Sequence, residues 1–222
     1  MDYTAQIKAL KKQLTRIAAG NLLPEKSFLA RGTALYFYLN HRISLDLVFF
    51  TPSSFTPETF AYRLRTCLKD ISVELMERET VIAFIGEEKI KLSLFFYPFE
   101  PLSALQFIKP APDVFCSAAS LEDIAAMKAV AVTQRGSAKD FVDLYFLVQQ
   151  AQLTFHNLLN LTLKKYSLQP GYEYHLKTAL VYFDDAEKEY DAIRLIHKEG
   201  YTDSMVEHEW QTLKQFFHAF IL

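Results

Sequence analysis

The sequence predicts an α+β fold in which a mixed sheet with flanking helices precedes an all-helical C-terminal domain. Three runs of strand-like composition lie close together in the first half of the chain: 72–77, 80–85 and 89–97. Four prolines then interrupt the pattern: Pro98, Pro101, Pro110 and Pro112. Beyond them helical periodicity dominates. We therefore expect two domains, 1–110 and 111–222.

The composition fits an ordinary globular protein. With 222 residues, of which half are hydrophobic and 14% aromatic, the chain can bury a sizeable core. Its 24 basic residues nearly cancel its 26 acidic ones, which gives a net charge of −2. This balance does not indicate a general coat for nucleic acid, although a local basic patch stays open.

The cysteines and the N-terminal segment indicate a cytoplasmic protein. Cys67 and Cys116 lack the spacing of a metal knuckle or a redox pair, and two lone thiols suit a reducing compartment. Residues 1–20 alternate charged and apolar residues, so they contain neither the apolar core of a signal peptide nor a membrane span. We expect no membrane partner.

Periodicity and end signals place the first elements. Apolar residues at helical spacing predict a helix over 3–19, which Gly20 ends. Thr56 as N-cap, Pro57 in the first turn and Glu58 near the helix start predict a helix that runs to about residue 68. Three shorter elements precede it: a strand over 27–30, a helix over 32–40 and a strand over 44–50.

The later elements follow the same rules. The run over 89–97 alternates, with Lys91, Ser93 and Phe95 on one side of the strand. Residues 77–79 and 86–88 are typical of hairpin turns. Six helices are predicted after the prolines: 121–135, 138–150, 153–165, 171–182, 186–198 and 203–220.

One residue of the predicted strand over 44–50 needs an explanation. Asp46 is its single carboxylate, among Leu45, Leu47 and Val48. A buried carboxylate costs several kcal/mol unless another group pairs with it. We therefore expect Asp46 to have a partner or a functional role.

Two blocks of sequence resemble the AbiEii/AbiGii-type nucleotidyltransferase toxins. Residues 29–51, LARGTALYFYLNHRISLDLVFFT, are similar to the family's Leu-Ala-Gly-Gly-Thr-Ala-Leu, His-Arg-x-Ser and Asp-Leu-Asp-Phe-Phe pattern. Residues 120–147 resemble the family's lysine-bearing helix and its Arg-Gly-x-x-Lys-Asp-x-x-Asp-Leu helix. The order of the blocks and the distance between them also fit.

The resemblance implies a nucleotidyltransferase-like fold and an activity. Such a protein transfers a nucleoside monophosphate from an NTP, with Mg²⁺, to an RNA or protein acceptor. Some family members are similar to toxins that modify the acceptor end of tRNA. A separate antitoxin, often a DNA-binding regulator, is the implied partner.

The metal ligands that this reaction requires are incomplete. Two divalent ions need several hard oxygen ligands, which an Asp-x-Asp strand and a third acid on a neighbouring strand normally supply. Here Asp46 is the remaining metal ligand, because Val48 stands at the second acid and Ser93 at the third. Glu87 and Glu88 are nearby in sequence but lie in a predicted turn. We therefore expect weak or absent activity.

The glycine turn of the family also differs. Arg31-Gly32 replaces the glycine pair, which lets backbone N–H groups approach a phosphate. Gly32 and Thr33 can still provide this contact at the helix start. Arg31 either obstructs the site or adds a positive charge toward phosphate, and the sequence leaves both open.

Lys128 is predicted to face the protein interior. Ser120 is a credible N-cap, and at about 100° per residue Leu121, Ala125 and Lys128 then share one helix face. The functional interpretation is a cation for triphosphate oxygens. The structural alternative is a lysine that is ion-paired or extends along apolar surface.

The remaining candidates are charged residues near helix ends. The Ser137-x-x-Asp140 spacing predicts a capping motif, while family analogy makes Asp140 a partner of Lys128 or of the acceptor. Arg42 is predicted to bind phosphate or to fix Asp46, and Asp143 to pair with Arg42 or Arg135. The catalytic interpretation requires Asp46 and Lys128 to face a common cleft. The alternative is a non-catalytic module that binds nucleotide, RNA or a protein.

Overall fold

A computed structural model describes residues 3–68, 70–197 and 201–222 and separates the chain into two compact units. The first unit combines Met1–Ala34, Ser44–Glu100 and Leu105–Ala119, and the second combines Leu35–Ile43, Pro101–Ala104 and Ser120–Leu222. Each unit is therefore assembled from separate stretches of the chain.

The first unit is built on a mixed seven-stranded sheet in the order β3-β4-β5-β2-β1-β7-β6. The strands are β1 (Phe28–Leu29), β2 (Leu47–Thr51), β3 (Ile71–Glu77), β4 (Thr80–Ile85), β5 (Ile90–Phe96), β6 (Gln106–Ala111) and β7 (Val114–Ala118). The pairs β2–β5 and β1–β7 are parallel and the others antiparallel. The predicted mixed sheet is confirmed.

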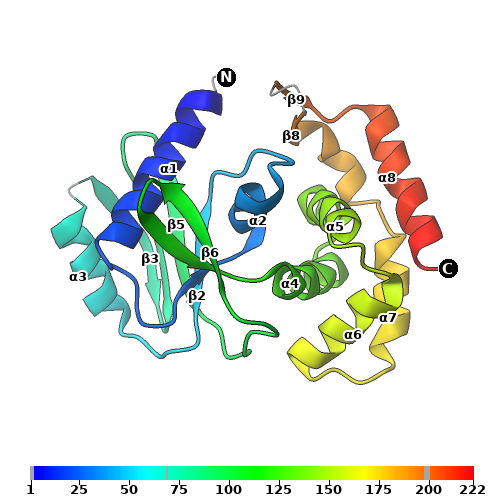
Figure 1. Ribbon diagram of the computed structural model, residues 1–222, viewed down its shortest axis with the longest axis horizontal. Coiled ribbons are helices and arrows are strands. Elements are labelled where there is room, and N and C mark those ends of the chain that lie inside the picture. Colours follow the sequence, from blue (N-terminus) through cyan, green and yellow to red (C-terminus); the bar gives the residue numbers. More distant parts are fainter. Residues whose placement is uncertain (1–2, 69, 198–200) are drawn as a thin grey trace. The chain divides into compact units, whose positions relative to one another are not determined.

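Two helices pack against this sheet (Figure 1). α1 (Tyr3–Ala19) contacts β5, β6 and β7, while α3 (Pro57–Cys67) contacts β3 and β4. The predicted helix over 3–19 is confirmed at both ends, and its apolar residues Leu10, Leu14 and Ile17 are fully buried. The core of this unit therefore lies between α1, α3 and one face of the sheet.

The proline-rich stretch, which the sequence indicates only as a domain boundary, contains a strand that was not predicted. β6 runs through Pro110, and β6 and β7 form an antiparallel hairpin at one edge of the sheet. Proline is tolerated there because an edge strand does not use all its N–H groups in the sheet. A register shift between Ile108 and Ala111 accommodates it.

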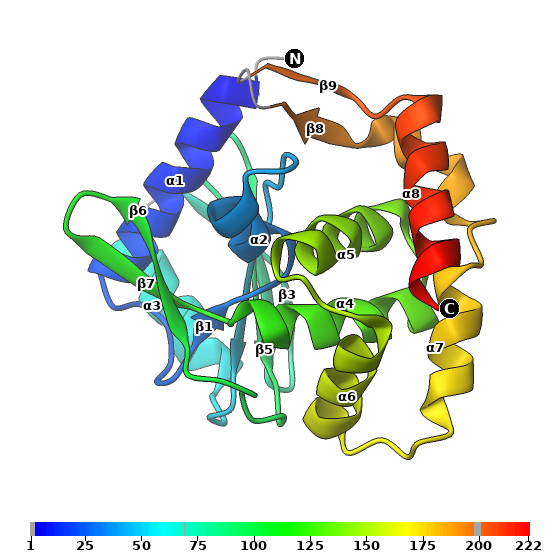
Figure 2. The same cartoon turned by 45° about the vertical axis from the view of Figure 1, so that its right-hand side comes forward.

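The second unit is mostly helical. Its helices are α4 (Leu121–Gln134), α5 (Ala138–Gln150), α6 (Phe155–Tyr166), α7 (Tyr172–Leu180) and α8 (Glu207–Phe220). α4 contacts α5, α6 and α7, and α5 also contacts α8; α4 and α5 lie side by side in both views (Figures 1 and 2). Three large aromatic side chains are fully buried in this core: Phe141, Trp210 and Phe217.

Part of the predicted helical region adopts other structure. Two 3₁₀ turns, Ala186–Lys188 and Tyr190–Ala192, stand in place of the first half of the helix predicted over 186–198. They lead into β8 (Arg194–Ile196), which pairs with β9 (Thr202–Ser204). Residue 198 lies outside the described residues. The C-terminal region therefore carries a small two-stranded sheet that the sequence did not predict.

None of the helices in the described ranges combines the length and apolarity that crossing a membrane requires.

Candidate functional site

The predicted site residues form two groups, and each group lies within one unit. The first unit contains Gly32, Thr33 and Asp46. The second unit contains Arg42, Lys128 and Asp140.

Thr33 links the residues of the first group. It is fully buried near the start of α2 (Arg31–Leu39). Its hydroxyl donates a hydrogen bond of 2.6 Å to the backbone oxygen of Asp46 and lies 2.9 Å from the hydroxyl of Ser44. The first turn of α2 is thus fastened to the segment that enters β2. Such a turn leaves backbone N–H groups that can bind an anion.

Asp46 is not the buried strand residue that the sequence predicts. β2 begins at Leu47, one residue later, and Asp46 is exposed. No hydrogen bond or ion pair of its carboxylate is found within the described part of the chain. The expected burial cost is therefore absent, because water solvates the charge.

The two residues that replace the family's acids are neighbours. Val48 on β2 is the register partner of Ser93 on β5. Their side chains are nearly inaccessible, 8% and 3% exposed. The two positions are therefore adjacent on neighbouring strands, and that the family carries acids at these two positions stays a prediction.

The residues present do not fit a two-ion magnesium centre. Among the described residues, no group of three or more His, Cys, Asp or Glu side chains could hold a metal ion. Mg²⁺ prefers near-octahedral oxygen coordination, and Asp46 supplies one carboxylate where the family pattern has three. The carboxylate of Asp46 could therefore coordinate at most one Mg²⁺ ion, and that ion would arrive bound to the phosphates of a nucleotide.

Arg31 occupies an unusual backbone conformation at the start of α2. Its φ is 62°, in the left-handed region that favours glycine. For a residue with a side chain this conformation costs about 1 kcal/mol or more. The guanidinium lies over two aromatic rings, 5.4 Å from the centre of Phe50 and 5.9 Å from that of Phe95. Glycine would fit the backbone of this position better than arginine does.

The second group centres on a buried ion pair between Arg42 and Asp143. Arg42 donates from Nε to Oδ1 at 2.7 Å and from Nη2 to Oδ2 at 2.8 Å, a bidentate contact. A third bond runs from Nη1 to the backbone oxygen of Ile43. The backbone of residues 41–43 in turn pairs with β8. Of the two partners predicted for Asp143, the structure therefore has Arg42.

Lys128 lies between two carboxylates. Its Nζ is 2.8 Å from Oδ1 of Asp140 and 2.6 Å from Oδ2 of Asp143. The lysine is 4% exposed, and both aspartates are fully buried. The inward direction predicted from helical spacing is therefore correct, as is its pairing with Asp140.

Asp140 collects three donors near the start of α5. Arg135 contacts it through Nε at 2.6 Å and Nη2 at 2.9 Å, in addition to Lys128. Ser137 is the N-cap residue as predicted, but its hydroxyl donates to the Asp140 carboxylate at 2.8 Å instead of accepting from a backbone N–H. The side-chain bond of the predicted capping motif is thus reversed in direction.

The charges of this cluster shift the pKa of each acid downward. Burial alone would raise the pKa of Asp140, but the hydrogen bonds of Arg135 and the charge of Lys128 outweigh it and hold the pKa well below its usual range. For Asp143 burial is likewise outweighed, by the charges of Arg42 and Lys128. Both carboxylates are therefore ionised at neutral pH.

His41 completes the cluster as a neutral side chain. Burial lowers its pKa below 6.5, although Asp143 acts in the opposite direction. Its Nε2 lies 2.7 Å from Oδ1 of Asp143, so Nε2 carries the donated hydrogen. Its Nδ1 is buried without a hydrogen-bond partner among the described residues.

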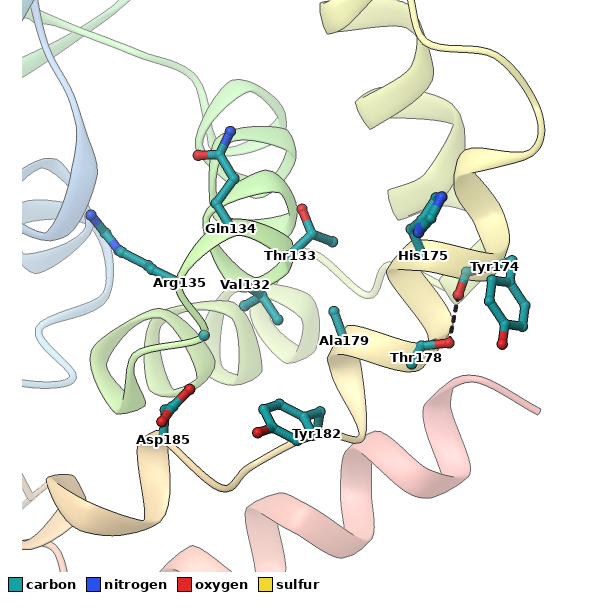
Figure 3. Close-up of a pocket in the computed structure, with 11 residues that line it drawn as sticks. Val132, Thr133, Gln134, Arg135, Tyr174, His175, Thr178, Ala179, Tyr182 and Asp185 are labelled. Atoms are coloured by element: carbon teal, nitrogen blue, oxygen red, sulfur yellow. Dashed lines mark hydrogen bonds between the residues drawn. The ribbon is translucent and has the colours of Figure 1, made fainter.

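A pocket of about 360 Å³ opens elsewhere in the second unit, between the end of α4 and α7 (Figure 3). Thr133, Arg135, His175, Tyr182 and Asp185 are among its lining residues. None of the predicted site residues lines it. Arg135 lines this pocket and also binds Asp140, so one side chain belongs both to the pocket and to the buried group of Arg42, Lys128, Asp140 and Asp143.

Sequence reasoning missed two features of these groups. The left-handed backbone of Arg31 was not foreseen, although a non-glycine residue at a glycine position is the signal that could have revealed it. The contact of His41 with Asp143 joins residues 102 positions apart, and no local pattern in a single sequence encodes such a pair.

Comparison with known proteins places these observations in one family. A family described as "Nucleotidyl transferase AbiEii toxin, Type IV TA system" matches residues 24–219. An uncharacterised protein of Aquifex aeolicus, aq_aa25, is 35% identical over 191 residues, which covers 86% of this chain and 84% of the relative.

Solved structures agree on the fold. JHP933 from Helicobacter pylori has a TM-score of 0.58 at 17% identity, covering 99% of this chain and 93% of its own. MenT4, a nucleotidyltransferase toxin from Mycobacterium tuberculosis, has a TM-score of 0.54 at 14% identity, covering 100% of this chain and 85% of its own. At such identities the likeness shows the fold alone, and it is the nucleotidyltransferase fold.

Proposed function

Because this chain belongs to the AbiEii family of nucleotidyltransferase toxins, we propose that it binds a nucleoside triphosphate and transfers a nucleoside monophosphate to an RNA or protein acceptor only slowly. The family is that of a type IV toxin–antitoxin system, which implies an antitoxin partner. Transfer RNA is the acceptor to test first. Since nucleotides and tRNA are cytoplasmic, we place the protein in the cytoplasm as well.

The observation that carries this proposal is the hydrogen bond from Thr33, in the first turn of α2, to the backbone oxygen of Asp46, whose side chain is exposed. Thr33 fixes this turn to the backbone of Asp46, so an anion bound at the N–H groups of Gly32 and Thr33 would lie close to the carboxylate. That combination of anion-binding N–H groups and one acid suits a metal–nucleotide complex.

The reaction would follow the chemistry common to such transfers. An acceptor oxygen attacks the α-phosphorus of the NTP, the bond to the bridging oxygen breaks, and pyrophosphate leaves while the acceptor proton passes to a base. Negative charge grows on the leaving pyrophosphate. We propose Lys128 as the cation that stabilises it, with Asp140 and Asp143 holding the ammonium and Arg42 positioning Asp143. That Asp46 and Lys128 act on the same nucleotide stays a prediction.

Slow transfer follows from the metal ligands. Val48 cannot coordinate a metal ion, and the hydroxyl of Ser93 is a poor substitute for a carboxylate. These two residues also favour a second candidate function, a non-catalytic module that binds nucleotide, RNA or a partner protein without transfer.

Calorimetry and a transfer assay separate the two functions. We expect Mg·ATP or Mg·CTP to bind the protein, and labelled NTP to be incorporated slowly into total tRNA. Incorporation that disappears in Asp46→Ala supports the enzyme, and nucleotide binding without incorporation supports the module. If neither nucleotide binds, the chain shares the fold of the family and not its ligand.

A further inference from the structure

One face of the sheet in the first unit gathers the departures from the family pattern. Val48 and Phe50 alternate along β2 and share this face with their register partners on β5, Ser93 and Phe95. Lys91, two residues before Ser93, points to the same side. We call the surface formed by these five residues the Val48 face.

The guanidinium of Arg31 lies over the Val48 face. Its distances of 5.4 and 5.9 Å to the rings of Phe50 and Phe95 place a cation over the pair that lies two residues beyond Val48 and Ser93 on the same face. The side chain reaches this place from a backbone with φ of 62°. Backbone conformations of this kind persist only where their surroundings hold them, and they gather at functional sites.

The charge of the Val48 face is the reverse of what a metal centre needs. Its strand residues carry the ammonium of Lys91 and no carboxylate, and Arg31 adds a second positive charge. These two groups attract a polyphosphate and oppose a divalent cation. Asp46, two residues before Val48 and just before β2, adds one negative charge beside this face.

We infer that Arg31, assisted by Lys91, binds the phosphate oxygens of a nucleoside triphosphate directly, so that the protein holds its nucleotide without Mg²⁺. The planar guanidinium can donate two parallel hydrogen bonds to one phosphate group. Its positive charge takes the place of the charge that a metal ion would supply. This inference rests on the proposed binding of a nucleoside triphosphate and names the group that recognises it.

Binding of ATP and of inorganic triphosphate, each measured by calorimetry with EDTA and with Mg²⁺, tests the inference. We expect the wild-type protein to bind both ligands in EDTA. Arg31→Gly should weaken binding in EDTA by about tenfold or more, because it removes a bidentate charged donor. Arg31→Lys keeps the positive charge but not the two parallel donors of the guanidinium, so it should lose less affinity than Arg31→Gly.

Lys89→Gly is the matched control. Lys89 is exposed, has a φ of 53° and loses the same charge on substitution by glycine. It precedes β5, about 20 Å along the strand from Phe95 at 3.3 Å per residue. We expect its binding in EDTA to equal that of the wild type, and circular dichroism should show that both glycine variants are folded.

Three results would overturn the inference. Wild-type binding that requires Mg²⁺ contradicts it and leaves the proposed function intact, as does an Arg31→Gly variant that binds as tightly as the wild type in EDTA. Absence of ATP binding both in EDTA and in Mg²⁺ overturns the proposed function together with the inference.

Discussion

Val48 on β2 and Ser93 on β5 are register partners, and both side chains are buried. The resemblance predicts an acid at each of these positions. Two adjacent strands of the sheet therefore present neutral side chains where carboxylate ligands are expected. An intact fold and an incomplete ligand set are compatible on this interpretation.

Restoring the second acid should restore a response to metal. Val48→Asp places a carboxylate two residues after Asp46, and without metal we expect it to lower the free energy of unfolding by about 1–3 kcal/mol, because the charge is buried. Mg²⁺ with NTP should raise the melting temperature of this variant, by about 2–4 °C per kcal/mol of binding energy. Thermal melting with and without Mg·ATP measures both effects.

Val48→Asn is the control for that experiment, because it has the shape of aspartate without the charge. It should show the destabilisation and no Mg²⁺ response. The response of Val48→Asp should grow when it is combined with Arg31→Gly, which removes a repelling cation. Equal responses of the aspartate and asparagine variants to Mg·ATP would show that the carboxylate is not at a metal position.

Removing Lys128 should destabilise the protein strongly. Lys128→Met removes the ammonium that pairs with the buried carboxylates of Asp140 and Asp143. Removing one partner of a buried ion pair lowers the free energy of unfolding by about 3–5 kcal/mol. Urea unfolding measures the loss. Lys177→Met removes the same charge from a pair with Glu173 that is 40% and 48% exposed, and should cost less than about 1 kcal/mol. A loss at Lys128 as small as at Lys177 would contradict the buried cluster.

Asp140 should make stability depend on acid pH. Its pKa is lowered in the folded protein because the contacts of Arg135 and Lys128 outweigh its burial. Its carboxylate therefore contributes stability that is present above the unfolded pKa of about 3.9 and is lost as pH falls toward the lower folded pKa. The free energy of unfolding, measured in urea at several pH values between 6 and 3, should depend less steeply on pH for Asp140→Asn than for the wild type. Identical slopes would argue against an ionised Asp140.

His41 should titrate below its usual range. Burial lowers its pKa from 6.5, so as pH falls the unfolded chain takes up a proton before the folded protein does. Stability therefore declines as pH falls through 6.5 toward the folded pKa. NMR titration of the imidazole measures this pKa directly. Asp143→Asn removes the carboxylate that hydrogen-bonds His41 and should lower the pKa of His41 further, whereas a rise would contradict this contact.

Gly86 should be destabilised by any side chain. Its φ is 77°, which strains a residue with a Cβ, and that Cβ would lie 2.6 Å from Nε2 of the Gln13 side chain in α1. We expect Gly86→Ala to cost about 1–3 kcal/mol in the free energy of unfolding. Gly171→Ala is the control, because nothing lies within 4 Å of its added Cβ. Equal melting temperatures of the two variants would contradict the close packing of α1 on the β4–β5 turn.

The local sequence pattern was sufficient to predict a helix where apolar residues keep helical spacing over several turns. The helices over 3–19 and 138–150 end where the sequence predicts, because their apolar spacing and end signals agree. The hairpin of β6 and β7 was missed because proline normally excludes a strand, and its place at a sheet edge is a tertiary fact. β8 was missed for a similar reason, since it pairs with residues 41–43 and 202–204.

The structure tests the positions and contacts of the predicted site residues, whereas their roles stay predictions. Helical spacing alone indicated that Lys128 faces inward, and the resemblance supplied Asp140 as its partner. The sequence left two partners open for Asp143, because the distance to Arg42 depends on how distant segments fold together. The solvent exposure of Asp46 depends on where β2 begins, and strand ends are poorly encoded by local pattern.

The interleaving of the two units limits how this protein can be dissected. Asp143 of α5 takes its guanidinium partner from Arg42, which enters the helical unit from the other half of the chain. A fragment that starts after the prolines would keep Asp143 and leave its arginine behind. Expressing the two halves as separate fragments would therefore remove a buried ion pair from the helical unit. Functional mapping should rely on point substitutions in the intact chain.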